Sequence, residues 1–147
     1  MAKKQRVRYV VGFMFDPTLS KVVLIRKLRP KFQHDLLNGV GGKVEDGEAA
    51  DTAMSREFFE ETGVQTTSWT EFLHLVTPDA DLTFFRAIGN VHAVTTTTDE
   101  EVKVYDVLDV MDRCDTLPNI RWIIQMARTF HFGEHAKRFE VKEVVAE

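Results

Sequence analysis

The chain has 147 residues, of which 44% are hydrophobic and 29% are charged, and its formal net charge at pH 7 is −4. This length suits one domain with a sizeable core over residues 1–147. A negative net charge argues against a broad surface for nucleic acid, so no duplex is expected as a partner. No apolar run is long enough to cross a membrane. The single cysteine, Cys114, excludes an intramolecular disulfide and fits a reducing compartment, here expected to be the cytoplasm.

Strand signals dominate the start of the chain. Residues 6–15 and 21–26 are rich in β-branched and aromatic residues, and the turn at 16–18 between them predicts a hairpin. A polar, basic connection at 27–37 and a glycine-rich segment at 38–44 follow. Residues 49–62 predict a helix that stops at Gly63. The later predicted elements are strands at 72–76 and 82–94 that form a second hairpin about 78–81, an exposed loop at 95–101, a strand at 102–108, a helix from Pro118 or Asn119 to Gly133, and a last strand at 139–145.

The predicted helix at 49–62 carries a cluster of carboxylates. Glu57, Glu60 and Glu61 lie at positions i, i+3 and i+4 and share an arc of roughly 100°. Arg56 lies one turn before Glu60 and can pair with it, but one guanidinium cannot neutralise three acids. The face is therefore either a solvated acidic surface or a site for a hard divalent cation such as Mg²⁺ or Mn²⁺, which prefers carboxylate oxygens.

The residues around this helix follow one longer pattern, G-x5-E-x7-R-E-U-x-E-E-x-G-U, in which U is a bulky apolar residue. The pattern runs from Gly42 to Val64 without a gap. It is the Nudix box, and the chain resembles the Nudix hydrolases of nucleoside-diphosphate-linked compounds. The resemblance implies an α+β (mixed α/β) fold with a mixed central sheet sandwiched between helices. The irregular alternation of predicted strands and helices agrees with that fold.

The resemblance also implies roles for the box residues. The implied metal ligands are the carbonyl of Gly41 and the carboxylates of Glu57, Glu60 and Glu61, with Mg²⁺ or Mn²⁺ as the cofactor. Glu57 is either a ligand or the base that deprotonates the attacking water. Arg56 would orient Glu57, and Glu48 would brace the loop or touch a second metal shell.

Four residues outside the box are candidates for substrate binding. Asn38 opens a run, NGVGGKV, that resembles the oxidised-purine nucleoside triphosphatases, in which this asparagine hydrogen-bonds the purine. A carboxamide can do so because it both donates and accepts hydrogen bonds. The alternative is that Asn38 is a turn residue. Lys27 matches a basic residue that contacts a substrate phosphate in MutT-type enzymes, or is a solvated strand end. Phe32 matches an aromatic wall for the base, or packs in the core. Asn119 matches an asparagine that reads the base, or caps the late helix.

Other residues leave alternatives open. Glu100 and Glu101 lie where Nudix enzymes often place a further acidic ligand or base; Glu100 is favoured as a metal ligand, with a solvated acidic loop as the alternative. Trp122 is expected in the core rather than as a stacking platform. His131 and His135 are four residues apart but have no evident third ligand, so they predict no metal site. The paired aspartates of the oxidised-purine enzymes are missing near the late helix, so the chain mixes features of two subgroups.

Together these features predict a Mg²⁺- or Mn²⁺-dependent nucleoside triphosphate pyrophosphohydrolase with a place in nucleotide-pool sanitation. The expected substrate is a (deoxy)nucleoside triphosphate, with oxidised purines such as 8-oxo-dGTP among the candidates, cut to the monophosphate and pyrophosphate. The alternatives are a Nudix hydrolase of dinucleoside polyphosphates or nucleotide sugars, and a nucleotide-binding domain of low turnover. The intact box argues against the binding domain, because a pure binder need not keep three glutamates and Arg56. The sequence leaves open whether the protein is a monomer or a homodimer.

Overall fold

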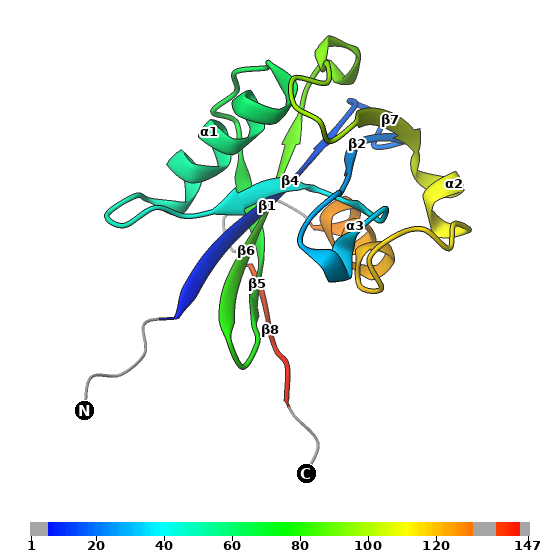
Figure 1. Ribbon diagram of the computed structural model, residues 1–147. Helices are drawn as coiled ribbons and strands as arrows, with labels where there is room; N and C mark the ends of the chain where they lie inside the picture. Colours follow the sequence, from blue (N-terminus) through cyan, green and yellow to red (C-terminus); the bar gives the residue numbers. More distant parts are fainter. Residues whose placement is uncertain (1–5, 131–137, 145–147) are drawn as a thin grey trace, which may run out of the picture.

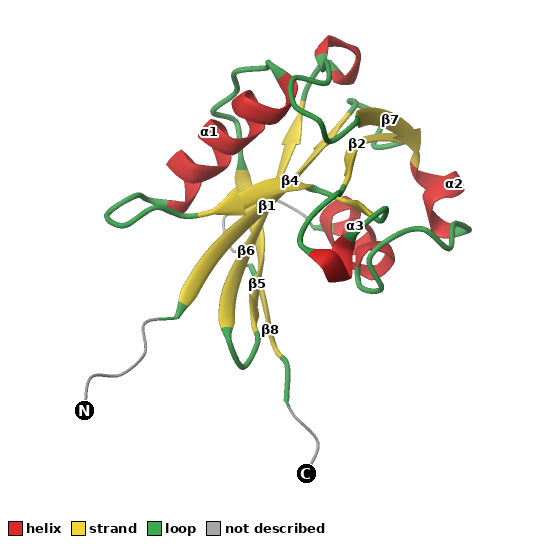
Figure 2. Cartoon of the chain, viewed as in Figure 1, coloured by secondary structure: helices red, strands yellow, loops and turns green. Residues whose placement is uncertain are grey.

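Strand β1 (Val7–Phe15) lies at the centre of an eight-stranded mixed sheet in the computed structural model, which describes residues 6–130 and 138–144 (Figures 1 and 2). The other strands are β2 (Lys21–Arg26), β3 (Leu37–Asn38), β4 (Val40–Lys43), β5 (Thr70–Val76), β6 (Ala80–Ile88), β7 (Val102–Asp106) and β8 (Phe139–Lys142). The helices are α1 (Ala50–Thr62), α2 (Val107–Met111) and α3 (Ile120–Thr129), with the 3-10 turns η1 (Lys31–Gln33) and η2 (Val91–Ala93). This arrangement confirms the α+β fold with a mixed sheet.

The pairing of β1 makes the sheet mixed. Along one edge, β1 runs parallel to β6 over its whole length, from the pair Val7↔Ala80 to the pair Phe15↔Ile88. Along the other edge it is antiparallel to β4 near its start and to β2 at its end, where Phe15 faces Val22. The expected hairpins β1–β2 and β5–β6 are both antiparallel pairs, so both are confirmed. The main strand order is β3-β2-β1-β6-β5-β8, with β4 on β1 and β7 on β2.

Alternate residues of β1 serve two separate cores, as the two-residue period of a strand requires. Val10 and Met14 pack with Met54 and Phe58 of α1 on one face of the sheet. Phe13 belongs to the core on the other face, which α2 and α3 cover. The residues that these two helices bury there are Val107, Val110, Ile120, Ile123, Ile124 and Ala127. Figure 1 shows α1 and α3 on opposite sides of β1, so the sheet is sandwiched as expected.

The box helix α1 forms as its composition predicts and begins one residue later than expected. It ends at Gly63, which takes the left-handed conformation at φ 75° and donates its backbone N–H to the carbonyl of Phe59. A residue with a side chain adopts this conformation only at a cost, so glycine is the natural stop. Among the residues described, no helix is long and apolar enough to span a membrane.

Several predicted boundaries are wrong for local reasons. β6 ends at Ile88 rather than at residue 94, because the side chain of Asn90 accepts from the His92 N–H and begins η2. β7 ends at Asp106 and is followed by the short helix α2, which the sequence analysis missed. The glycine-rich segment at 38–44 contains β3 and β4. α3 ends at Thr129, because its C-cap Phe130 has an extended backbone, so the expected helix end at Gly133 is wrong. β8 ends at Lys142, so the expected strand end at residue 145 is wrong as well. The histidines at 131 and 135 lie outside the described residues.

The expectation that Trp122 packs in the core is wrong. The buried residues of α3 are Ile120, Ile123, Ile124 and Ala127, which share one face of the helix. At about 100° per residue, Trp122 falls on the opposite side. Its side chain is 41% exposed.

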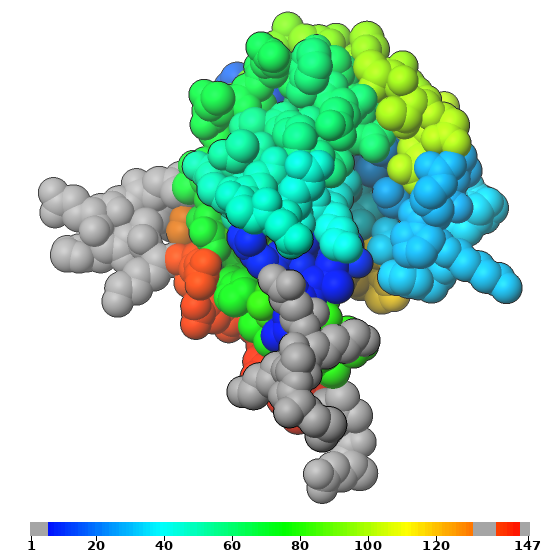
Figure 3. All heavy atoms as spheres, turned by 60° about the vertical axis from the view of Figure 1, so that its left-hand side comes forward, coloured from blue at the N-terminus to red at the C-terminus, as the bar shows by residue number. Residues whose placement is uncertain are grey.

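The segment 95–101, called the threonine loop below, lies against α1. The N–H of Thr95 donates to the carbonyl of Thr62, the last residue of that helix, at 3.0 Å. In Figure 3 the loop, in yellow-green, lies between α1 in green and the connection after β2 in light blue. Most of the loop is exposed as expected, but Glu100 is only 3% exposed, so the prediction is wrong for that residue.

Candidate active site

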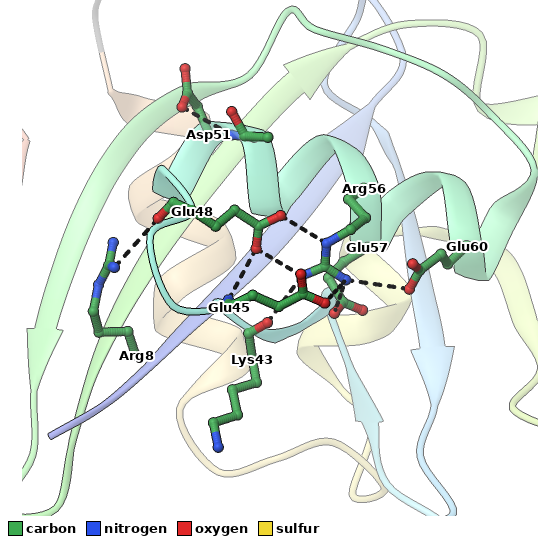
Figure 4. Close-up of polar contacts among 9 residues, drawn as sticks. Arg8, Lys43, Glu45, Glu48, Asp51, Arg56, Glu57 and Glu60 are labelled. Atoms are coloured by element: carbon green, nitrogen blue, oxygen red, sulfur yellow. Dashed lines mark hydrogen bonds and ion pairs between the residues drawn. The ribbon is translucent and has the colours of Figure 1, made fainter. Parts of the chain in front are cut away.

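Arg56 joins the strand, loop and helix of the box (Figure 4). Its Nε and Nη2 atoms donate to the two carboxylate oxygens of Glu48 at 2.8 and 2.9 Å. Its Nη1 donates to the Oε1 atom of Glu57 at 2.9 Å, and Nη2 also donates to the carbonyl of Lys43 at the end of β4. Such planar, charge-assisted pairs are strong and directional. The contact expected between Arg56 and Glu57 is therefore present.

Glu48 braces the loop before α1. Besides its pair with Arg56, its Oε1 atom accepts the backbone N–H of Glu45 at 3.0 Å. The Arg56 guanidinium, helped by that N–H, lowers the pKa of the Glu48 carboxyl to about 2. Glu48 therefore stays ionised at any ordinary pH and fixes Arg56 in place.

Glu57 lies in a space that Gly42 leaves open, while Gly41 lets β4 approach the backbone of β1. A Cβ atom added to Gly42 would come within 2.6 Å of both Glu57 carboxylate oxygens, and one added to Gly41 would lie 1.9 Å from the carbonyl oxygen of Val10. Burial raises the pKa of Glu57, while the Arg56 guanidinium opposes that rise. The side chain of Glu57 is 14% exposed. It is thus a shielded carboxylate held by one arginine.

Negative charge exceeds positive charge around Arg56. The guanidinium lies within 4.0 Å of carboxylates from Glu45, Glu48, Glu57 and Glu60. One positive charge cannot offset four negative ones, and the donors are all oxygens, which suit Mg²⁺ or Mn²⁺. The residues available thus fit a hard divalent cation.

The box carboxylates are also bonded to protein partners. Glu61 accepts the hydroxyl of Thr98 at 2.9 Å, and Glu60 lies 3.5 Å from the Arg56 guanidinium. Within the described ranges, no three acidic, histidine or cysteine side chains converge as a metal site in this arrangement. The assignment of individual metal ligands therefore stays a prediction.

A pocket of about 730 Å³ lies beside the box glycines. Its walls are mostly apolar, as small-molecule sites commonly are. The four residues expected to bind substrate, Lys27, Phe32, Asn38 and Asn119, all line it. Gly41 and Gly42 line it as well, and the carboxylate of Glu57 lies beside Gly42.

The two asparagines differ in how their side chains are used. The Oδ1 atom of Asn38 accepts the N–H of Gly39 at 2.7 Å, as in a turn, and its Nδ2 donates to Gln33 in a long contact of 3.4 Å. Asn119 occupies the N-cap of α3, but its side chain makes no capping hydrogen bond. The capping role that competed with base reading for Asn119 is therefore absent in this structure.

Lys27 and Phe32 reach the pocket from the connection after β2. Phe32 is 74% exposed, so the alternative that it packs in the core is wrong. The ammonium of Lys27 forms an ion pair with Glu100 at 3.1 Å and is not a solvated strand end. Glu100, expected beside the box carboxylates as a metal ligand, contacts this connection instead.

Several residues that line the pocket were not predicted from the sequence. Tyr9, Leu82 and Glu143 line the pocket from β1, from β6 and from the end of β8. No local pattern marks them, because they meet only through the β1–β6 and β5–β8 pairings. Thr98, which bonds Glu61, carries a weak signal in the run of four threonines.

Solved structures share this fold at low sequence identity. A MutT structure from a study of the Aliivibrio salmonicida and Vibrio cholerae proteins has a TM-score of 0.69 and 22% identity, over 86% of this chain and 100% of that one. The MutT NUDIX hydrolase of Burkholderia pseudomallei has a TM-score of 0.71 and 16% identity, over 84% and 98%. The NUDIX domain of Shewanella oneidensis NrtR, solved with ADP ribose, has a TM-score of 0.72 and 18% identity, over 86% and 88%.

Sequence comparison identifies the family. No curated protein sequence matches the chain significantly. The family model of the NUDIX domain matches residues 5–123, which include the whole box and all four predicted substrate residues. The chain therefore belongs to the NUDIX domain family and is a Nudix hydrolase.

Proposed function

We propose that this single Nudix domain, residues 1–147, hydrolyses a phosphoanhydride of a (deoxy)nucleoside triphosphate to the monophosphate and pyrophosphate. Oxidised purine triphosphates such as 8-oxo-dGTP are the first candidates, which would place the protein in nucleotide-pool sanitation. The lone cysteine, Cys114, supports the cytoplasm as its compartment.

One observation carries this proposal: Gly42 borders both the pocket and the carboxylate of Glu57. Gly42 lines the pocket, and the carboxylate of Glu57 fills the space where a side chain of Gly42 would stand. A nucleotide in the pocket would thus bring its phosphates to the carboxylates. The base would remain among the more distant apolar walls.

Nudix hydrolases cleave the pyrophosphate linkage of nucleotide derivatives and generally use divalent metal ions. In this chain the proposed ligands are the carbonyl of Gly41 and the carboxylates of Glu60 and Glu61, with Glu57 as a further ligand in the alternative in which it is not the base. A bound Mg²⁺ or Mn²⁺ would neutralise phosphate charge and lower the pKa of bound water.

Glu57 is the proposed base for the attacking water. Its burial raises its pKa, and a base is most effective when its pKa approaches the working pH. Arg56 fixes one carboxylate oxygen at 2.9 Å and leaves the other free of that contact. Glu57 is thus oriented while one oxygen remains available for a proton.

The pocket residues supply the proposed substrate contacts. Lys27 would contact a phosphate, Phe32 would cover one face of the base, and the carboxamides of Asn38 and Asn119 would bond its edge. The ADP ribose in the NrtR structure favours a second candidate, a nucleotide sugar or related diphosphate, in the same kind of site.

A turnover screen tests the proposal. The protein is incubated with Mg²⁺ or Mn²⁺ and a panel of nucleoside triphosphates, their oxidised forms, dinucleoside polyphosphates and nucleotide sugars, and the products are identified by mass. We expect metal-dependent release of pyrophosphate from a purine triphosphate.

Glu57→Gln, which keeps the side-chain volume, should lower kcat by roughly 10²–10⁴ and change KM less. Arg56→Ala should be milder if Arg56 acts only by orienting Glu57.

Three outcomes would contradict parts of the proposal. Cleavage of nucleotide sugars or dinucleoside polyphosphates, with triphosphates left intact, would overturn the substrate and retain the chemistry. A Glu57→Gln variant with the kcat of the wild type would show that another group is the base. Absence of turnover on the whole panel would favour a binding role.

A further inference from the structure

Glu100 is the only buried charged residue among those that the structure describes. Its Oε1 atom pairs with the ammonium of Lys27 at 3.1 Å. Its Oε2 atom accepts the backbone N–H of Leu28 at 2.6 Å and, in a longer contact of 3.4 Å, that of Arg29. Both oxygens of Glu100 thus bind the connection that follows β2.

The threonine loop fixes Glu100 relative to the box helix. The hydroxyl of Thr98 donates to the Oε2 atom of Glu61, and its oxygen also accepts the N–H of Glu100 at 3.2 Å. The hydroxyl of Thr97 donates to the carbonyl of Glu60. Glu100 is therefore held by groups attached to α1, and it projects toward the neighbouring connection that Figure 3 shows in light blue.

Lys27 stands between Glu100 and the pocket. Lys27 lines the pocket, whereas the described lining does not include Glu100. The side chain of Lys27 is 17% exposed and that of Glu100 is 4% exposed. A lysine on a flexible stem loses rotamer freedom when it binds a phosphate. An ion pair on its far side removes much of that freedom beforehand.

We infer that Glu100 is a positioning residue that holds Lys27 at the pocket for a substrate phosphate, and that it is neither the metal ligand nor the base of the site. The inference rests on the proposed function, in which Lys27 contacts phosphate. It also links the box to the pocket, because the loop that binds Glu61 through Thr98 also fixes Lys27 through Glu100.

A double-mutant cycle separates positioning from metal binding. The variants are Lys27→Met, Glu100→Gln and the double variant. The affinity for a non-hydrolysable nucleoside triphosphate analogue is measured by calorimetry, and the affinity for Mn²⁺ alone by electron paramagnetic resonance. We expect Lys27→Met to weaken nucleotide binding by about ten- to 100-fold, as for the loss of a charged hydrogen bond. Glu100→Gln should weaken it less, and the double variant should bind no more weakly than Lys27→Met.

The affinity for Mn²⁺ distinguishes a positioning role of Glu100 from a role as a metal ligand. All three variants should bind Mn²⁺ as the wild type does. Glu101→Gln is the matched control, because Glu101 is the next residue in the loop and its side chain is 54% exposed; it should change neither affinity. Weaker Mn²⁺ binding in Glu100→Gln, or a double variant weaker than Lys27→Met in nucleotide binding, would overturn the inference.

The cycle remains decisive if Glu100→Gln alone fails to fold. The double variant leaves no unpaired charge at this site, so it avoids the cost of a lone buried ammonium. Comparing the double variant with Lys27→Met then shows whether the loss of Glu100 changes the affinity for the nucleotide or for Mn²⁺. If Lys27→Met leaves nucleotide affinity unchanged, Lys27 does not contact a phosphate, and the inference that Glu100 positions it is wrong as well. If Lys27→Met weakens binding and Glu100→Gln adds an independent loss, only the inference fails.

Discussion

The carboxylate of Glu57 occupies the place where a side chain of Gly42 would stand. A Cβ on Gly42 would lie 2.5 Å from the carboxyl carbon and 2.6 Å from each oxygen. No real Cβ makes such contacts, so any larger residue would displace the carboxylate. The box glycine and the box glutamate are thus one steric unit, although they are fifteen residues apart.

Gly42→Ala should therefore inactivate the protein without unfolding it. Within the described part of the chain, the carboxylate of Glu57 has Arg56 as its hydrogen-bond partner, so this side chain should move before the backbone of β4 does. A displacement of about 1 Å at a reacting group costs on the order of 100-fold in rate. Steady-state kinetics and a thermal melt measure the two effects.

Gly47→Ala provides the matched control in the same loop. A Cβ there meets nothing within 4 Å, but Gly47 has φ 78°. It should lower stability by about 1–2 kcal/mol and keep kcat. A Gly42→Ala variant with normal kcat would show that Glu57 tolerates displacement or is not needed.

Glu60→Gln and Glu61→Gln test the metal assignment. Each removes one charge and keeps the side-chain volume, so Mn²⁺ affinity should fall by at least about tenfold. Removing one of several clustered acids relieves repulsion. Both variants should therefore melt at or above the wild-type temperature when no metal is present.

Glu45→Gln is the control for this pair. Glu45 lies 4.0 Å from the same guanidinium, but its side chain is 71% exposed and sits in the loop. Its loss should leave Mn²⁺ affinity unchanged. Wild-type Mn²⁺ affinity in both Glu60→Gln and Glu61→Gln would refute the metal role of the helix.

Glu48 should stabilise the protein in a defined pH range. Its pKa is about 2 when folded, against an ordinary value of 4.5, because Arg56 favours the ionised form. A lowered pKa gives stability that is fully present above 4.5 and is lost as the pH falls toward 2. Glu48→Gln should thus lower the melting temperature at pH 7. The difference from the wild type should shrink between pH 4.5 and pH 2.

Melting curves at steps of pH check this expectation. Asp51→Asn is a suitable control, because Asp51 is also an acid near the start of α1, and among the described residues its side chain accepts a hydrogen bond from the neighbouring Thr52 N–H. The melting curves of Glu48→Gln and Asp51→Asn are compared with those of the wild type at each pH. A Glu48→Gln difference that stays constant from pH 7 to pH 2 would show that the variant acts by packing rather than by charge.

The box helix is predictable from the sequence because its determinants are local. Composition sets its length, Gly63 sets its end, and the spacing of the glutamates sets their common face. The exposed position of Trp122 is also local: the phase of the isoleucines in α3 places it on the outer side. The parallel pairing of β1 with β6 is different, since it joins segments that are distant in sequence. No local pattern encodes such a pairing.

The site divides in the same way. The pair of Arg56 with Glu57 is implied by the resemblance to the box and not by helix spacing, since adjacent residues on a helix do not face each other. The steric match of Gly42 with Glu57 is seen only in the folded chain. The burial of Glu100 depends on Lys27, which is 73 residues away. Glu143 reaches the pocket only because β8 pairs with β5. A sequence can indicate that an acidic loop residue matters, but the partner that defines its role comes from the fold.

Variants of Asn38 and Asn119 test whether the pocket recognises a purine base. Both line the pocket, and each side chain presents a donor and an acceptor on one planar group. Loss of one partner would leave a buried polar group of the base unpaired, at a cost of about 1–3 kcal/mol. That cost corresponds to roughly a five- to 150-fold loss in kcat/KM. Phosphate contacts would be unaffected, so the loss should depend on the base. Asn38→Ala and Asn119→Ala should thus lower the ratio of kcat/KM for the preferred purine triphosphate to kcat/KM for pyrimidine triphosphates.

The two asparagines also predict different effects on stability. Asn119 makes no capping hydrogen bond, so Asn119→Ala should leave the melting temperature nearly unchanged. Asn38 accepts the N–H of Gly39, so Asn38→Ala should lower it slightly. Asn90→Ala is a control outside the pocket, because Asn90 caps η2 and should lose stability without a change in nucleotide ranking. If the ranking across the nucleotide panel stays the same in both pocket variants, then neither asparagine reads the base, and recognition rests on phosphate contacts and the apolar walls.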